Sequence, residues 1–210
     1  MSTHETKEHW EKRYQENDRV WSGQVNVQFA EVAGDLPPGR ALDLGCGEGA
    51  DAVWLAERGW EVVAVDISDT ALTRGAEAAK SRGVADRIDF RQLDLSERFP
   101  EGTYDLISAQ FLHSTVYLDR SKILAEAAKA VRPGGVLVIV DHGSPPPWAS
   151  KLDHVHDFPS PEEVVAGLNL SDEEFERVRV DQVERQARTP DGGTAPWVDN
   201  VIVLRRRDPG

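Results

Sequence analysis

The residues best suited to chemistry lie in the stretch "ALDLGCGEGADAVWLAERGWEVVAVDIS" at 41–68. An apolar run leads there into a turn with three glycines, a residue that lets backbone amides come close to a ligand. Gly45, Gly47 and Ala50 fit the G-x-G-x-x-G/A pattern of dinucleotide-binding turns. Asp66 follows Gly45 by 21 residues, where a ribose-binding acid belongs. The spacing predicts a ligand with a ribose and leaves its identity open.

Acidic side chains beside this turn discriminate between ligands. Asp43 ends the preceding apolar run, and Glu48 lies inside the turn. Two unit charges about 4 Å apart interact by roughly 1–4 kcal/mol at effective dielectric constants between those of water and a protein surface. These acids repel a pyrophosphate and attract a ligand that carries an ammonium and a sulfonium. A cationic ligand is favoured, and a nicotinamide-dependent oxidoreductase is the alternative among enzymes.

The composition of the chain limits the kinds of partner that the protein is expected to bind. The chain has 210 residues, a formal net charge of −13 and a hydrophobic content of 40%. A nucleic-acid-binding protein usually presents a basic patch, whereas the basic run here is only Arg205 to Arg207. No apolar run approaches the ~20 residues that span a bilayer. We expect a cytoplasmic protein that binds a small molecule, with no nucleic-acid or membrane partner. The oligomeric state is not set by these features.

Apolar patterning predicts the elements that position the turn. After two amino-terminal helices, strands and helices alternate, which is typical of a parallel sheet covered on both faces. "RPGG" at 132–135 is expected to be a compact turn, and "TPDGGTAP" to join a final antiparallel pair. The predicted strands are 40–44, 61–66, 87–92, 104–109, 135–141, 174–188 and 197–206, and the predicted helices are 3–17, 26–34, 49–58, 69–82, 119–131 and 161–168.

Five ordered motifs carry a family resemblance. "LDLGCGEG" and "VVAVDIS" are followed by "DFRQLDL" at 89–95, "YDLISAQFLHS" at 104–114 and "VRPGGVLVIV" at 131–140. Residues 37–141 resemble class I S-adenosylmethionine-dependent methyltransferases. The resemblance implies an α/β, Rossmann-like, doubly wound fold with a seven-stranded, mostly parallel sheet and an antiparallel carboxyl-terminal pair. We expect one domain over 1–210, made of a helical lid (1–36), a cofactor-binding core (37–141), and a substrate loop with the last strands (142–210).

The resemblance also implies residue roles around S-adenosylmethionine. The turn backbone would pack on its methionine and ribose parts, and Asp66 would accept hydrogen bonds from the ribose hydroxyls, unless it is only a turn residue. Asp94 would accept from the adenine amino group, with a simple cap or turn role as the alternative. The single cysteine, Cys46, is expected to be small and buried. The implied cofactor contacts are Asp43, Gly45, Cys46, Gly47, Glu48, Gly49, Asp66, Ile67, Asp94, Leu95, Ala109, Gln110, Tyr14 and Trp21.

Aromatic residues precede the first motif. The segment "HWEKRYQENDRVWSGQVN" at 9–26 is similar to the corresponding region of the thiopurine and tellurite-resistance methyltransferases. That group places aromatic residues over the cofactor and substrate, a role that Tyr14 and Trp21 would share. Trp10 suits substrate contact and, equally, simple packing of its helix. Such a lid would exclude water from the reacting groups.

Histidines are the candidates for acceptor contact. His113 follows the predicted strand 104–109, and its ordinary pKa of ~6.5 suits proton acceptance, although a backbone-bonding loop histidine is the alternative. His142 and Trp148 lie past the next strand and are further substrate candidates. His154 and His156 form an H-x-H pair, but no metal site is expected, because polar loops collect such residues without a ligand.

The most specific expectation is methyl transfer from S-adenosylmethionine to an oxygen, sulfur or nitrogen of a small molecule, aromatic molecules included. The strand ends in "SAQF" and lacks the N/D-P-P-Y sequence of amino-group nucleic-acid methyltransferases. Direct in-line displacement needs a base only where the acceptor loses a proton. A cofactor-binding module without turnover is the alternative outside enzymes.

Overall fold

The computed structural model describes residues 3–114, 116–148 and 158–208. Its strands are β1 (Arg40–Leu44), β2 (Glu61–Asp66), β3 (Ile88–Gln92), β4 (Tyr104–Gln110), β5 (Val131–His142), β6 (Phe175–Arg188) and β7 (Thr194–Arg206). Its helices are α1 (Thr3–Gln15), α2 (Val27–Ala33), α3 (Ala50–Glu57), α4 (Asp69–Ser81), α5 (Arg120–Ala130) and α6 (Pro161–Gly167), with a 3-10 turn η1 (Ala85–Arg87). The predicted alternation of strands and helices is confirmed.

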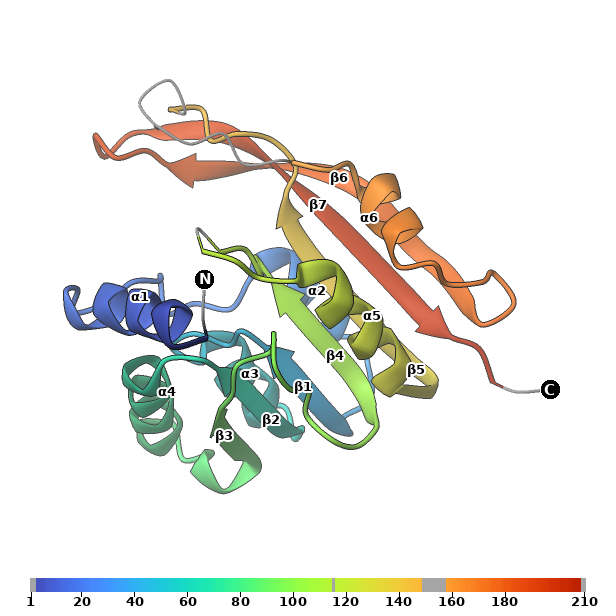
Figure 1. Ribbon diagram of the computed structural model, residues 1–210, viewed down its shortest axis with the longest axis horizontal. Helices are drawn as coiled ribbons and strands as arrows, with labels where there is room; N and C mark the ends of the chain where they lie inside the picture. Colours follow the sequence, from blue (N-terminus) through green and yellow to red (C-terminus); the bar gives the residue numbers. More distant parts are fainter. Residues whose placement is uncertain (1–2, 115, 149–157, 209–210) are drawn as a thin grey trace.

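The strands form one seven-stranded sheet in the order β3-β2-β1-β4-β5-β7-β6 (Figure 1). β7 runs antiparallel to both of its neighbours, and the other neighbouring strands are parallel. This is the predicted α/β, Rossmann-like arrangement with an antiparallel carboxyl-terminal pair. The strand order reverses between β1 and β4. Open α/β sheets bind ligands in the crevice at such a switch point, outside the carboxyl ends of the strands.

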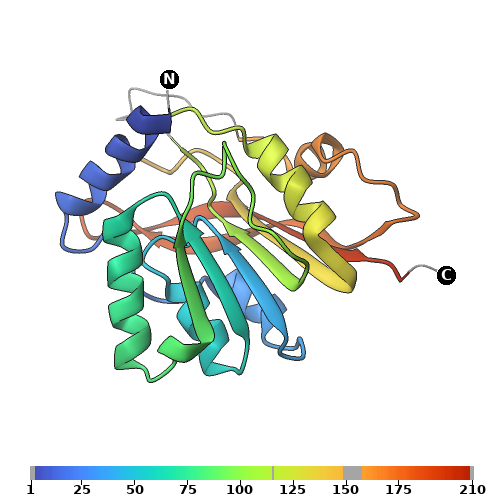
Figure 2. The ribbon, with the colours of Figure 1, turned by 60° about the horizontal axis from the view of Figure 1, so that its bottom comes forward.

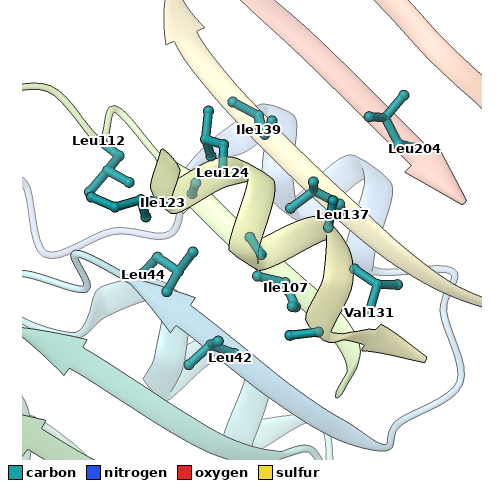
Figure 3. Packing of buried hydrophobic residues seen from close by; sticks show 14 of the residues in the cluster. Leu42, Leu44, Ile107, Leu112, Ile123, Leu124, Val131, Leu137, Ile139 and Leu204 are labelled. Atoms are coloured by element: carbon teal, nitrogen blue, oxygen red, sulfur yellow. The ribbon is translucent and has the colours of Figure 1, made fainter. Parts of the chain in front are cut away.

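Helices cover both faces of the sheet (Figure 2). Successive strand residues point to opposite faces, so neighbours in sequence pack into different clusters. Leu42 and Leu44 of β1 pack with α5 and α6, whereas Ala41 packs with α2, α3 and α4. Figure 3 shows the first cluster, in which Ile107 and Leu137 lie beside the α5 side chains Ile123 and Leu124.

The predicted cap residues Ser68, Gly83 and Ser160 are confirmed. The Ser68 hydroxyl accepts a hydrogen bond from the Ala71 amide at 3.1 Å and caps α4, and Gly83 has the left-handed φ of +72° that follows this helix. The Ser160–Glu163 capping box is also present, at the start of α6. Within the described part of the chain, no helix is both long enough and apolar enough to span a bilayer.

Two local predictions, the starts of β5 and of β7, are wrong. "RPGG" does not form a turn before the strand, because β5 already begins at Val131. Gly134 takes a φ of +76°, and the β4–β5 register shifts between Tyr104 and Leu106, so the Pro-Gly segment is accommodated as an irregularity inside the ladder. β7 likewise begins at Thr194, three residues earlier than predicted, because Thr194 pairs with Arg188 across the hairpin.

The core position Ile107 provides a test of this packing. Its side chain is fully buried between β1, β5 and α5. Ile107→Ala should lower the free energy of unfolding by about 2–5 kcal/mol, because it removes buried methyl groups and leaves a cavity. Val27→Ala is the control, since Val27 is 74% exposed, and should change that free energy by less than about 0.5 kcal/mol. Urea denaturation measures both, and equal effects would contradict this core.

Candidate active site

The glycine turn joins β1 to α3 in a left-handed backbone. Gly45, Gly47 and Gly49 have φ values of +67°, +52° and +77°, a region that side chains rarely allow. A Cβ atom on Gly47 would lie 2.9 Å from Trp21 Nε1 and 3.0 Å from the Tyr14 hydroxyl. The sequence therefore needs glycine here both for conformation and for the close approach of two aromatic residues.

Asp66 is built into this turn. It ends β2, and its carboxylate accepts hydrogen bonds from the Gly47 and Ser68 amides, both at 2.9 Å. Burial raises the pKa of Asp66, and these amide donors oppose that shift. Ile67 is half-buried beside it. The fold thus places the predicted ribose-binding acid, at the end of β2, beside the glycine turn that follows the neighbouring strand β1.

Asp43 is buried at the end of β1 and is only partly paired. Its Oδ1 accepts from the Ser108 hydroxyl at 2.8 Å, whereas its Oδ2 is buried with no hydrogen-bond partner in the described chain. Burial and the Asp51 carboxylate raise the pKa of Asp43 to about 8, against the Ser108 hydrogen bond. An unpaired buried carboxylate oxygen is costly, and a bound cation would offset that cost.

The end of β4 lies beside Asp43. Ala109 is fully buried, and Gln110 holds both of its side-chain polar atoms buried without a partner among residues 3–114, 116–148 and 158–208. Such atoms are normally satisfied in a folded protein. Gln110 therefore has two buried polar atoms that a bound polar ligand could satisfy, which is compatible with its predicted role.

The remaining predicted contacts have local partners. Asp94 Oδ1 accepts from the Ser96 amide at 2.8 Å, which is the turn geometry expected as the alternative to an adenine contact. Leu95 packs against the core. Burial raises the pKa of the Cys46 thiol well above its ordinary value, so Cys46 is a poor nucleophile.

Aromatic residues of the amino-terminal segment cover the turn. Trp21 Nε1 donates to the Tyr14 hydroxyl at 2.8 Å, and the Arg13 guanidinium lies over the Trp10 and Trp21 rings at 5.3 and 5.4 Å. Trp10 Nε1 donates to the Ser114 hydroxyl at 3.1 Å. The three predicted aromatics are therefore brought together over the glycines, and Trp10 extends this cover to the segment after β4.

Glu48 of the glycine turn and Arg74 of α4 bind the amino-terminal segment. The Glu48 carboxylate accepts from Arg74 Nη1 at 2.9 Å and from the Trp21 amide at 3.1 Å. Arg74 Nη2 also donates to the Tyr14 and Asn17 carbonyls. In this structure Glu48, predicted to attract a cationic ligand, has its charge compensated by Arg74 and contacts the segment that covers the turn.

Glu11 makes a second attachment at the amino-terminal end of α4, where α1 lies across it (Figures 1 and 2). Its carboxylate accepts from the Ser68 hydroxyl at 2.7 Å and from the amide and hydroxyl of Thr70. Burial would raise the pKa of Glu11, but the Thr70 and Ser68 hydrogen bonds outweigh it and lower the pKa to about 2. A carboxylate at a helix amino terminus is also favoured by the helix dipole.

A second group of aromatic side chains lies near the carboxyl ends of β4 and β5. His142, at the end of β5, stacks on Trp197 with centroids 4.0 Å apart and on Phe111 with centroids 4.3 Å apart. Trp148 meets Trp197 edge-on at 5.2 Å, and His113 lies parallel to His142 at 6.0 Å. The predicted substrate residues His113, His142 and Trp148 thus form one cluster around Trp197, which sequence reasoning missed.

Two buried acids anchor this cluster. Asp141 pairs with Arg120 and lies 3.4 Å from His113 Nε2, while Asp199 pairs with Arg185. Burial raises the pKa of Asp141, and Arg120 opposes that shift. None of these four acids and arginines was predicted. In the sequence, the two acids could have been noticed as acidic residues inside apolar runs, Asp141 in "VLVIVDH" and Asp199 in "WVDNVIVL".

Metal binding has no support in the described chain. No group of three or more His, Cys, Asp or Glu side chains is arranged there to hold an ion. His154 and His156, the H-x-H pair of the sequence, lie outside the described residues.

The Glu11 attachment makes a testable prediction. Glu11→Ala should release α1 from α4, with a loss of about 1 kcal/mol in the free energy of unfolding, because it removes the hydrogen bonds that Glu11 accepts from Ser68 and Thr70. Hydrogen exchange should then speed up in 3–15 while the β1–β4 amides stay protected. Because the pKa of Glu11 is lowered, the contact is complete above its ordinary value of 4.5 and is lost only as pH falls through about 2. Lys12→Ala, on the exposed side of α1, is the control. Unchanged exchange in 3–15 would contradict this attachment.

Comparisons with known proteins agree with this geometry. A family model described as a methyltransferase domain matches residues 42–139. The demethylmenaquinone methyltransferase of Thermus thermophilus is 33% identical over 147 residues, which are 67% of this chain and 66% of that protein. The ribosomal RNA small subunit methyltransferase C of Alcanivorax borkumensis is 34% identical over 111 residues, which are 49% of this chain and 32% of that protein. The chain thus spans less than two thirds of either relative's length.

Solved structures share the fold. The 1,6-didemethyltoxoflavin-N1-methyltransferase of Burkholderia thailandensis, solved with S-adenosylhomocysteine and its acceptor, superposes with a TM-score of 0.70 at 24% identity. The match covers 99% of this chain and 92% of that one. Residues 42–139, which hold the glycine turn and most of β1 to β5, therefore match the methyltransferase domain family, and the chain has the fold of the class I S-adenosylmethionine-dependent methyltransferases.

Proposed function

We propose that this chain transfers a methyl group from S-adenosylmethionine to an oxygen, sulfur or nitrogen atom of a small planar molecule. The observation that carries the proposal is the buried, unpaired carboxylate oxygen of Asp43 beside the left-handed glycine turn. A ligand with an ammonium and a sulfonium is the partner that such an oxygen favours, and a pyrophosphate is not.

The chain's own residues suit this cofactor. Asp66 would face the ribose, the Gly45–Gly49 backbone its methionine and ribose parts, and Gln110 the polar end of the methionine. Asp94 and Leu95 would border the adenine, with Ile67 on its face. When bound, the cofactor supplies a methyl group activated by positive sulfur, so the protein's contribution is to orient the acceptor and exclude water.

The acceptor side is the cluster around Trp197, and Trp10 lies near it through its hydrogen bond to Ser114, the residue after His113. Parallel aromatic rings and two buried ion pairs favour a planar, partly polar molecule. The Alcanivorax relative acts, by its name, on ribosomal RNA, but a net charge of −13 disfavours binding of this chain to a phosphate backbone. The lid (1–36), core (37–141) and final segment (142–210) would work as one unit.

The cofactor assignment is tested at Asp66. Asp66→Ala should weaken binding of S-adenosylhomocysteine by at least about fivefold, or ~1 kcal/mol, because it removes acceptors for the ligand and loosens the glycine turn. Isothermal titration measures the change, and Asp86→Asn, on the exposed η1, is the matched control. Unchanged affinity would remove Asp66 from the site. Tight binding of NAD, without measurable binding of S-adenosylhomocysteine, would overturn the proposed function.

The raised pKa of Asp43 predicts proton release on cofactor binding. Burial raises the pKa values of both Asp43 and Asp51, so the free protein holds a proton on this pair of carboxyls near neutral pH, and a cationic ligand favours the carboxylate form. Binding of S-adenosylmethionine between about pH 6 and 7 should release up to one proton, and its affinity should rise with pH. Titrations in buffers of different ionisation enthalpy measure the release. Asp43→Asn should abolish it, and an equal release in that variant would exclude Asp43 as its source.

A further inference from the structure

A row of side chains crosses one face of the sheet from β4 to its edge strand β6 (Figure 1). His142 of β5 lies opposite Asp199 of β7 in the ladder. Trp197, two residues before Asp199, shares its face and lies opposite Arg185 of β6. Gln110 of β4 pairs with the β5 residue two before His142, so it lies on this face as well. The row therefore begins beside the candidate cofactor contact Gln110 and ends at Arg185.

Asp199 fixes the guanidinium of Arg185. This carboxylate is 1% exposed; its Oδ2 accepts a hydrogen bond from Arg185 Nε, and its Oδ1 lies 3.3 Å from His142 Nδ1. The guanidinium carbon lies 5.1 Å from the centre of the Trp197 ring and 5.8 Å from that of the Phe111 ring. An aromatic face attracts a cation placed over it. The Arg185 side chain is thus held by one buried carboxylate and by two rings.

The terminal nitrogens of Arg185 are available to a ligand. The side chain is 31% exposed, and within residues 3–114, 116–148 and 158–208 its Nε is the atom that donates a hydrogen bond. Nη1 and Nη2 are not buried and have no hydrogen-bond partner in that part of the chain. A guanidinium whose Nε is engaged still presents these two nitrogens as a planar fork, which matches the two oxygens of a carboxylate.

The charge around this fork suits an anion that carries a single negative charge. The chain has a formal net charge of −13, so a free anion is repelled overall and needs a local cation to bind. Arg179 of the same strand is paired with Asp181 at 3.0 Å, whereas the Arg185 fork is open. Because Asp199 already compensates part of the Arg185 charge, the fork fits a carboxylate better than a doubly charged phosphate.

Aromatic side chains beside the fork suit a planar ring. Trp148 meets Trp197 at an interplanar angle of 70° with ring centroids 5.2 Å apart, so the two half-buried indoles form a corner. Trp197 is fixed in this corner, because its Nε1 donates to the Ser144 carbonyl at 2.8 Å and its ring stacks on His142. Aromatic rings pack favourably against such surfaces. An apolar corner for a ring and a cationic fork for an attached anion therefore lie side by side.

We propose, on the basis of the methyl transfer proposed above, that Arg185 selects acceptors that are aromatic carboxylic acids. Its Nη1 and Nη2 bind the carboxylate, Asp199 positions the guanidinium, and the acceptor ring lies against Trp148 and Trp197. A carboxylate held by the fork has its lone pairs engaged in hydrogen bonds. The methyl group therefore goes to a hydroxyl, thiol or amine elsewhere on the acceptor and not to the carboxylate.

The first measurement is acceptor binding to the unaltered protein in complex with S-adenosylhomocysteine. Isothermal titration with 2-, 3- and 4-hydroxybenzoate is compared with the matching hydroxybenzamides, which keep the ring and the hydroxyl but carry no charge. At least one acid should bind about tenfold to a hundredfold more tightly than its amide, the usual contribution of hydrogen bonds to a charged group. Amides that bind as tightly as their acids, or acids that show no binding, would overturn the role of Arg185.

Variants assign the preference to the fork. Arg185→Gln should abolish the preference of the acid over its amide, and Arg185→Lys, which keeps the charge without the fork, should retain part of it. Asp199→Asn should reduce the preference without changing the affinity for the amide, because the guanidinium is no longer fixed. Arg179→Gln is the matched control, since Arg179 is a paired arginine of the same strand, and should keep the full preference.

Turnover, followed as S-adenosylhomocysteine formed, gives a second readout. Arg185→Gln should raise KM for the preferred acid by about tenfold to a hundredfold with kcat nearly unchanged, because the fork binds the carboxylate equally before and during methyl transfer. KM for the amide should stay the same. A purely structural role of Arg185 would instead weaken the acid and the amide alike.

The outcomes separate the two proposals. Equal kcat/KM for acid and amide, a methyl ester as the product, or a full acid preference in Arg185→Gln overturns the role of Arg185 but leaves methyl transfer intact. Failure of the unaltered protein to bind S-adenosylhomocysteine would instead overturn the proposed function. The affinity of each variant for S-adenosylhomocysteine, measured by titration, distinguishes a lost fork from lost folding.

Discussion

The hydrogen bonds that Asp66 accepts from Gly47 and Ser68 hold three parts of the site in place. They tie the end of β2 to the glycine turn after β1 and to the start of α4. Ser68 in turn caps α4 and donates to Glu11, so the amino-terminal helix rests on the same point. The cofactor side and its cover thus share one anchor. A single carboxylate sets the position of the glycines, the helix and the lid together.

The acidic side chains around the glycine turn differ in whether their charge is paired with a cation. Glu48 and Arg74 form an ion pair, so their charges compensate each other. Both side chains also make hydrogen bonds to the amino-terminal segment that covers the turn. At the bottom of the crevice Asp43 keeps an unpaired oxygen near Asp51 and Asp66. Arg74 pairs with Glu48 of the turn, whereas Asp43 Oδ2 has no partner in the described residues and is left for a ligand. This contrast is the physical basis for expecting a cation there.

Much of the fold followed from local patterns. The strands of the core are apolar runs bounded by Gly, Pro and Asp, and the Ser68 and Ser160 caps mark helix starts within one residue. The start of β5 was mispredicted because Gly134 suits a turn and equally suits a ladder irregularity, and only pairing with β4 decides between them. The sequence pattern around Asp94 likewise suits both an adenine contact and a turn, and in this structure its carboxylate accepts a hydrogen bond from the Ser96 amide of its own turn.

The sequence by itself determined the cofactor side, because a glycine turn and an acid one strand later must meet where parallel strands end together. It also indicated which aromatic residues cover that turn. Only the tertiary structure decided the acceptor side. Each carboxylate lies close in the chain to its own arginine, Asp141 to Arg120 of the preceding α5 and Asp199 to Arg185 across the β6–β7 hairpin, but residues 143–174 separate one pair from the other. No local pattern specifies that two such carboxylates become buried neighbours, because that depends on how β7 inserts between β5 and β6.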